Sequence, residues 1–225
     1  MKELETKLGY EFKDCSLLKT ALVHSSYANE NRHLHLECNE RLEFLGDSVL
    51  GLAVARHLFL SCPGMPEGRM TRLRAELVCE QSLYSVAQKL GLGRFIMLGR
   101  GEELTGGRER QSILADCVEA VIAAMYLDGG IEVASGFIGR MILAGFDPGA
   151  HAASADHKTE LQELVQRRSG QVLAYEMVGE SGPDHCKTFT ARVLLNGEPI
   201  GEGSGRSKKD AEQAAACRAL EELKK

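Results

Sequence analysis

The sequence lacks several features that distinguish membrane and secreted proteins from ordinary globular proteins. It has no run approaching roughly 18 uncharged apolar residues, so we expect no membrane-spanning segment and no membrane partner. Its first residues, MKELETKLGYEFKD, are charged throughout and have no apolar centre, so we expect no signal peptide. The seven cysteines form no CxxC pair, which indicates free thiols in a reducing cytoplasm.

The chain also has fewer basic than acidic residues. The chain has 27 Lys and Arg against 32 Asp and Glu, a formal net charge of −5. Proteins that bind a polyanion are usually basic, so this balance on its own argues against a nucleic-acid partner. The motifs described below reverse that expectation.

Two regions with different patterns follow one another along the 225 residues. Residues 1–146 show helical periodicity without a convincing alternating strand, which predicts an all-α domain. Residues 147–156 contain Pro and Gly and no large aliphatic side chain, a composition typical of a flexible linker. Residues 157–225 follow an α-β-β-β-α order, which predicts a small α+β domain.

The expected elements can be placed approximately. Helices are predicted at 39–60, 66–90 (one helix or two), 112–127 and 131–144, and strands at 172–180, 187–195 and 199–204. Asn196-Gly197 is a strong hairpin-turn signal, and Ser207 is expected to cap the closing helix.

Acidic side chains stand on two apolar helices of the first domain. Glu40, Glu43 and Asp47 fall within about 60° on one face of a helix at 39–60, although a solvated acidic face would look the same. Asp116 and Glu119 lie one turn apart on a helix that is apolar nearly all round. Buried carboxylates cost several kcal/mol unless they are paired or bind a metal, and this stretch has no Lys or Arg to pair them. The pattern therefore predicts a site.

If these two helices pack together, four or five carboxylates converge. Such a cluster needs a hard divalent cation with oxygen ligands, and Mg²⁺ is the obvious candidate. A carboxylate cluster without a His nucleophile suits metal-assisted phosphodiester hydrolysis. Glu67 is a further acid close by in the sequence, but the local pattern alone favours a surface Glu after a turn.

Two further motifs are weaker. His33, His35 and Cys38 are zinc-ligand types, but their spacing fits no familiar zinc site, which favours loop side chains without a metal. Arg108 and Arg110 precede a helix N-terminus and could help to hold phosphate, although a plain glycine turn is an equal alternative.

The second domain carries a polar helix face and a basic helix start. The polar face could hydrogen-bond the 2′-hydroxyls of a shallow RNA minor groove, although any amphipathic helix has such a face. A basic helix N-terminus favours anions, and the loop at 181–185 could add a contact. The polar face consists of Thr159, Gln162, Glu163 and Gln166, and the basic start of Arg206, Ser207, Lys208 and Lys209.

These motifs resemble those of one family, bacterial ribonuclease III. NERLEFLGDS at 39–48 is similar to its signature, and GRERQSILADCVEAVIAAMYLDGG at 107–130 resembles its second catalytic helix. The segment 158–222 resembles a double-stranded RNA-binding domain, through KTELQE near its start and SKKDAEQAAA near its end. The resemblance covers nearly the whole chain, in the family's order. It implies an all-α endonuclease domain followed by that small α+β domain.

The resemblance assigns roles position by position. It implies that Asp47 and Glu119 matter most for chemistry, that Glu40 and Glu67 assist, and that Cys38 and Cys117 depart slightly from the family pattern and could be sensitive to oxidation. The implied metal ligands are Glu43, Asp47, Asp116 and Glu119. The implied RNA contacts are Thr159, Gln162, Glu163, Gln166, His185, Ser207, Lys208 and Lys209.

The activity implied is that of a cytoplasmic, homodimeric, Mg²⁺-dependent endoribonuclease, with Mn²⁺ as a substitute and no organic cofactor. It would cut double-stranded RNA, including ribosomal RNA precursors, to 5′-phosphate and 3′-hydroxyl ends with a short 3′ overhang. Two other functions stay open: an RNA-binding regulator that has lost cleavage, and a DNA nuclease. The six proposed site acids account for the acidity of the first domain, so net charge no longer argues against nucleic acid.

Overall fold

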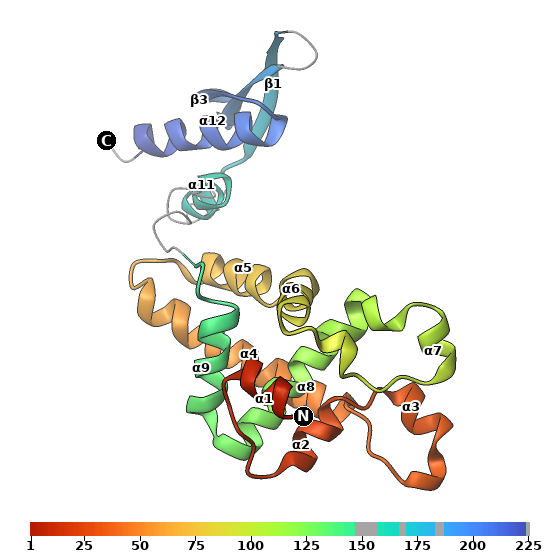
Figure 1. The fold of residues 1–225 in the computed structure, drawn as a ribbon. Coiled ribbons are helices and arrows are strands. Elements are labelled where there is room, and N and C mark those ends of the chain that lie inside the picture. Colours follow the sequence, from red (N-terminus) through yellow and green to blue (C-terminus); the bar gives the residue numbers. More distant parts are fainter. Residues whose placement is uncertain (147–156, 167–169, 183–186, 224–225) are drawn as a thin grey trace. The chain divides into compact units, whose positions relative to one another are not determined.

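The chain forms two compact units, residues 1–148 and 149–225, in a computed structural model. The structure describes residues 1–146, 157–166, 170–182 and 187–223 (Figure 1). The predicted linker at 147–156 lies outside the described residues. Each unit is considered by itself below.

The first unit is all-α, as predicted. Its described α-helices are α1 (Lys2–Leu8), α2 (Cys15–Ala21), α3 (Ser25–Glu30), α4 (Glu40–Ser61), α5 (Glu67–Leu77), α6 (Glu80–Leu90), α7 (Arg100–Leu104), α8 (Gln111–Gly129) and α9 (Ile131–Met141). The segment 66–90 is two helices, because Val78 ends α5 and Cys79 adopts an extended conformation before α6.

The core of this unit is built around α4 and α8, which pack along each other (Figure 1). α8 is buried on almost every side, as its apolar sequence predicts. The two helices approach closely at Gly46 of α4. A Cβ atom there would stand 1.9 Å from the backbone oxygen of Glu119 on α8, so only glycine permits this contact. Because this contact sets the spacing of the two helices, it also sets the spacing of the acids that they carry.

α4 also meets a simple criterion for a membrane span. It has 22 residues, and an 18-residue window within it has a mean hydropathy of 1.3, so the helix is long and apolar enough by length and composition alone. The expectation of no such segment rested on consecutive uncharged residues, and Asp47 and Arg56 interrupt the apolar stretch of this helix. This is weak evidence for a membrane segment, because the core helix of a globular protein passes the same test.

The second unit has the predicted α-β-β-β-α order. It comprises α11 (His157–Gln166), β1 (Leu173–Ser181), β2 (Thr188–Leu195), β3 (Glu198–Gly205) and α12 (Lys208–Leu223). The strands form an antiparallel sheet in the order β1-β2-β3. Asn196 and Gly197 both have positive φ, which is the turn conformation that an Asn-Gly hairpin requires.

The core of the second unit lies between the sheet and its helices. Leu161, Val165 and Val193 are buried against the alanine-rich face of α12. At Gly203 of β3 a Cβ atom would stand 2.2 Å from the backbone nitrogen of Ala215, so the strand and the helix touch backbone to backbone. This close packing holds α12 against β3, and the basic side chains stand at the start of that helix.

Candidate metal centre and RNA-binding surface

Three carboxylates from two helices meet in the first unit. Glu43 of α4 and Asp116 and Glu119 of α8 each offer one oxygen, and these oxygens all lie within 4.8 Å of one another. All three side chains are half-buried. Within the part of the chain that the structure describes, this is the one group of three or more possible metal ligands found.

The electrostatics of the cluster are those of acids without a counter-charge. Burial, followed by the negative charges of Asp47, Asp116 and Glu43, raises the pKa of Glu119 to about 7. Burial and neighbouring carboxylates, including Glu40, also raise the pKa of Glu43. These shifts show that Glu40 and Asp47, although exposed, act on the same centre.

Hard oxygen donors in a half-buried, negatively charged group fit a divalent cation of the Mg²⁺ type. In the described residues no ion pair joins Glu43, Asp116 or Glu119 to a basic side chain. A cation would therefore relieve a repulsion that the protein leaves uncompensated.

Glu67 lies apart from this centre within one chain. Its carboxylate accepts a hydrogen bond of 2.7 Å from the hydroxyl of Thr71. It lines an apolar hollow of about 370 Å³ with the second half of α4, including Leu52 and Phe59. The acids of the centre stand in the first half of α4, so closeness in sequence did not place Glu67 among them.

Sequence reasoning missed three residues at the centre. Glu80, the first residue of α6, and His24, just before α3, both act electrostatically on Asp116. Their distance in sequence hides this proximity. Gly46 could have been recognised from the sequence. A glycine inside a long helix lowers helix stability by about 1 kcal/mol, so its presence there implies a packing reason.

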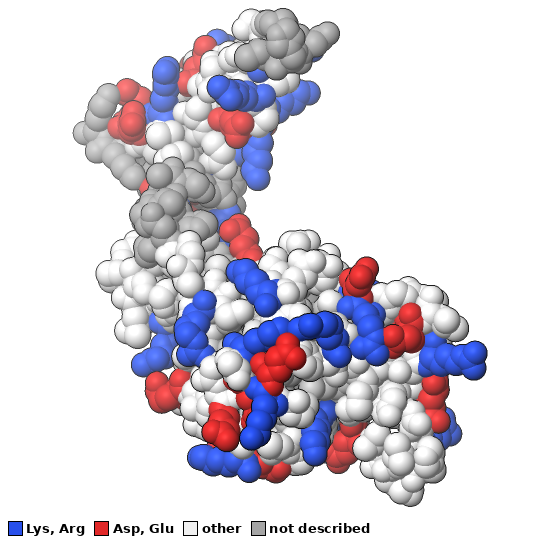
Figure 2. Space-filling view, in the orientation of Figure 1, with Lys and Arg blue, Asp and Glu red and all other residues white. Residues whose placement is uncertain are grey.

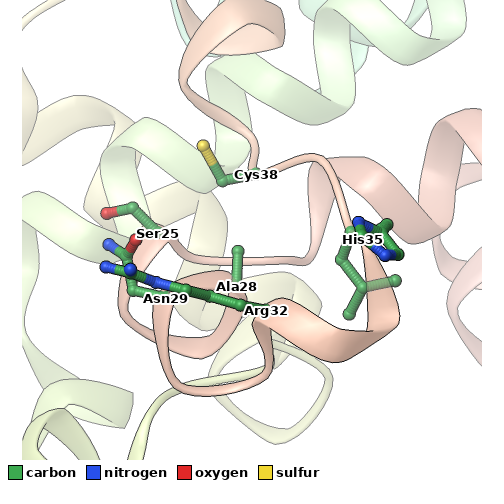
Figure 3. A pocket seen from close by; sticks show the side chains of 7 residues that line it. Ser25, Ala28, Asn29, Arg32, His35 and Cys38 are labelled. Atoms are coloured by element: carbon green, nitrogen blue, oxygen red, sulfur yellow. The ribbon is translucent and has the colours of Figure 1, made fainter.

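The zinc motif does not assemble. His35 and Cys38 line different sides of a shallow pocket of about 310 Å³ (Figure 3). His33, His35 and Cys38, all described, do not form a group of metal ligands. This agrees with the interpretation that they are loop side chains.

Arg108 and Arg110, in the turn before α8, are paired with other groups of the first unit. The guanidinium of Arg108 donates to the carbonyl oxygens of Gly93 (2.8 Å) and Ile96 (2.9 Å), and it pairs with Glu103. Arg110 pairs with Glu102. The phosphate-binding interpretation of these arginines therefore loses its support, because their guanidinium groups already bond to carbonyl and carboxylate oxygens of the protein.

Basic and acidic side chains are interspersed on the face of the first unit that Figure 2 presents. The first unit also contains ion pairs between such side chains, as between Arg94 and Glu3 at 2.8 Å. This face of the first unit therefore provides no broad positive field, and phosphate contacts on it would be local.

The two unusual cysteines differ in exposure. Cys117 is fully buried, burial raises the pKa of its thiol to about 12, and its Sγ lies 3.6 Å from the carbonyl oxygen of Ala21. Such a thiol is protected from oxidation. Cys38 is half-exposed, so the expected sensitivity to oxidation stays a prediction for that residue alone.

The proposed RNA contacts of the second unit occupy its surface. On α11, Gln162, Glu163 and Gln166 are exposed and Thr159 is half-buried, opposite buried Leu161 and Val165. At the start of α12, Lys208 and Lys209 are exposed. Ser207 accepts a hydrogen bond of 3.1 Å from the backbone N–H of Asp210, so the predicted cap is present. His185 lies outside the described residues.

Both units match known protein families. A family model described as Ribonuclease-III-like matches residues 14–146, and one described as double-stranded RNA binding motif matches residues 157–223. Ribonuclease 3 of Listeria monocytogenes is 48% identical over 222 residues, which cover 99% of this chain and 97% of that protein. Ribonuclease 3 of Geobacillus thermodenitrificans is 51% identical over 223 residues, which cover 99% of this chain and 91% of that protein.

A solved structure is also similar to the first unit. The nuclease domain of ribonuclease III from Campylobacter jejuni covers 64% of this chain and 97% of its own, with 44% identity and a TM-score of 0.60. That protein is described as flexible in a region involved in dimer formation.

These findings define a class: a helical nuclease joined to a double-stranded RNA-binding domain. The chain belongs to the ribonuclease III family. It is accordingly an endoribonuclease that acts on double-stranded RNA.

Proposed function

We propose that the reaction depends on Mg²⁺, or on Mn²⁺ in its place, held by Glu43, Asp47, Asp116 and Glu119. The observation that carries this proposal is the convergence of three of these carboxylates without a basic partner among the described residues. The ion would supply Lewis-acid stabilisation of charge on the phosphodiester. The carboxylates would hold and orient the ion, and Glu40 strengthens the negative potential around Glu43.

The expected products are 5′-phosphate and 3′-hydroxyl ends with a short 3′ overhang, and the expected substrates include ribosomal RNA precursors. This part of the proposal is supported by the resemblance to the family. The free thiols of the described cysteines are compatible with the proposed cytoplasmic location.

The exposed face of α4 supports a homodimer. Phe44, Leu52 and Phe59 lie along one side of the helix and are 78%, 60% and 68% exposed. Next to them is the apolar hollow that Met70 and Glu67 also line. A contiguous apolar face of this kind marks an interaction surface, and a second copy of the chain would cover it. Glu67 would then lie at the interface.

RNA binding by the second unit is proposed to combine two surfaces. Exposed polar groups on α11 can bond 2′-hydroxyls, and Lys208 and Lys209 stand where the dipole of α12 also favours phosphate. Together they would recognise the A-form shape of a duplex more than its base sequence.

The deciding experiment is cleavage of a long RNA duplex by the full chain in Mg²⁺ or in EDTA, with wild type and Glu119→Ala. Wild type should cut only with the metal, and the variant should bind the duplex but not cut it. If wild type binds the duplex tightly and never cuts it in Mg²⁺, the chain is an RNA-binding regulator instead. Equal cleavage of a DNA duplex of the same sequence would identify a general nuclease.

A further inference from the structure

Lys158, in the first turn of α11, joins that helix to α12 through two contacts. Its Nζ lies 2.6 Å from Oε2 of Glu212, and its backbone N–H donates to Oε1 of Gln213 at 3.2 Å. The ammonium group also stands 4.5 Å from the centroid of the Tyr175 ring on β1, which is close enough for a cation–π interaction. The side chains of Lys158 and Glu212 are only 33% and 27% exposed, so salt screens this pair less than it screens a fully exposed pair.

These contacts lie one helical turn from the basic start of α12. Residues four apart on a helix are neighbours on its surface, so Glu212 is adjacent to Lys208. The two side chains have opposite charges, yet among the described residues Lys208 makes no ion pair, and Glu212 pairs with Lys158 instead. Lys158 therefore neutralises a carboxylate that would otherwise compete with phosphate for the ammonium group of Lys208.

Loss of the charge of Lys158 would have two consequences. The half-buried carboxylate of Glu212 would lose its cation, and Lys208 is the basic group one turn away on the same helix. Their attraction would lower the positive potential that Lys208 offers to a phosphate. The first turn of α11 would also lose an anchor, whereas Leu161 and Val165 would still hold the later turns against α12.

We propose that Lys158 is a positioning residue for RNA binding: it ties α11 to α12 and engages Glu212, so that the ammonium group of Lys208 stays available to a phosphate of the duplex. The inference rests on the RNA-binding surface proposed above. Because Lys158 acts through Glu212, it needs no contact of its own with the RNA. The ion pair thus links the polar face of α11 to the basic start of α12, the two surfaces that the duplex must meet together.

The competing explanation is that the ion pair only stabilises the second unit. Lys158→Met removes the charge and keeps an apolar stem, and a double variant adds Glu212→Gln to it. Both variants lack the ion pair, so a purely structural pair predicts an unchanged salt dependence of RNA binding in both. The proposed role predicts a difference, because only the single variant leaves a carboxylate that can engage Lys208.

The test measures binding of the full chain to a fluorescent RNA duplex in EDTA, by anisotropy at several salt concentrations. Lys158→Met should bind about fivefold more weakly than wild type and lower the slope of log affinity against log salt by about 1. The double variant should regain the wild-type slope, and Lys158→Arg, which keeps the charge, should bind within about twofold of wild type. The matched control is Arg192→Met, which removes an ion pair with Glu202 (2.9 Å) on the sheet and should keep the slope.

The inference is overturned if Lys158→Met keeps the wild-type slope, or if the double variant does not regain it. Thermal melting shows whether each variant is folded, and Lys158→Gln, which is also neutral, replaces Lys158→Met under the same criteria if the latter is not. A failure of the RNA surface itself has a different signature. If Lys208→Ala leaves the slope unchanged, the proposed phosphate contact is wrong, whereas a lower slope for Lys208→Ala alone refutes only the role of Lys158.

Discussion

Gly46→Ala tests the packing that brings the catalytic helices together. In an ordinary exposed helix position this change would add up to about 1 kcal/mol of stability, because alanine has the higher helix propensity. Here the new Cβ atom would stand 1.9 Å from the carbonyl oxygen of Glu119, 2.5 Å from its carbonyl carbon and 3.0 Å from its Cα. The obstructing atoms are backbone, so no side-chain rotation can relieve the clash.

Relief of this clash requires α4 and α8 to separate by about 1 Å. Overpacking of this kind costs about 1–3 kcal/mol, which corresponds to a fall in Tm of roughly 3–10 °C for a domain of this size. The same separation would move Glu119 relative to Glu43. A displacement of about 1 Å at an active site can cost on the order of 100-fold in rate.

The matched control is Gly139→Ala on α9, where a Cβ atom would meet nothing within 4 Å. Thermal denaturation of both variants in EDTA, followed by circular dichroism, should show opposite signs: a lower Tm for Gly46→Ala and an unchanged or higher Tm for Gly139→Ala. Cleavage of an RNA duplex should fall for the first alone. If Gly46→Ala is as stable and as active as Gly139→Ala, the close approach of the two helices is wrong.

Three more predictions concern the titration, the assembly and the RNA surface. Burial and neighbouring carboxylates raise the pKa of Glu119 from 4.5 to about 7, so the folded, metal-free chain holds this proton more tightly than the unfolded chain. Its stability in EDTA should therefore decrease as pH rises from about 5 to about 8, and Glu119→Gln should flatten that dependence in urea titrations. Phe44→Asp should halve the mass found by light scattering, whereas Leu104→Asp, at an equally exposed position (78% in both cases), should leave it unchanged. An unchanged mass for both variants would contradict the α4 interface. Lys208→Ala should weaken duplex binding and lower the slope of log affinity against log salt by about 1, while Arg218→Ala, farther along α12, should leave the slope as it is. Equal slopes for both variants would exclude Lys208 as a phosphate contact.

The elements that the sequence predicted well are those determined by local rules. The apolar residues of α8, the Asn196-Gly197 turn and the Ser207 cap each depend on a few neighbouring residues, and all three occur in the structure. The apolar surroundings of Asp116 and Glu119 also indicated a site, because burial of a charge is visible in the sequence itself.

The features that could not be predicted from the sequence depend on contacts between residues far apart in the chain. Glu80, the first residue of α6, and His24, just before α3, act electrostatically on Asp116 from distant parts of the sequence, so no spacing rule connects them. Arg108 precedes a helix, which suggested an anion site, but its partners are carbonyl groups of Gly93 and Ile96 on a separate turn. A helix start indicates where an anion could bind, and only the fold shows whether the donors are free.

Two faces of α4 carry two different functions. Glu43 faces α8 and the centre, whereas Phe44 and Phe59 face outward. The outward face lacks a partner among the described residues, and Glu67 stands beside it, away from the centre of its own chain. A contribution of Glu67 to cleavage would therefore require the second copy that the apolar face is proposed to bind. Loss of the dimer through Phe44→Asp should then remove any effect of Glu67→Gln, since an interface residue cannot act without its interface.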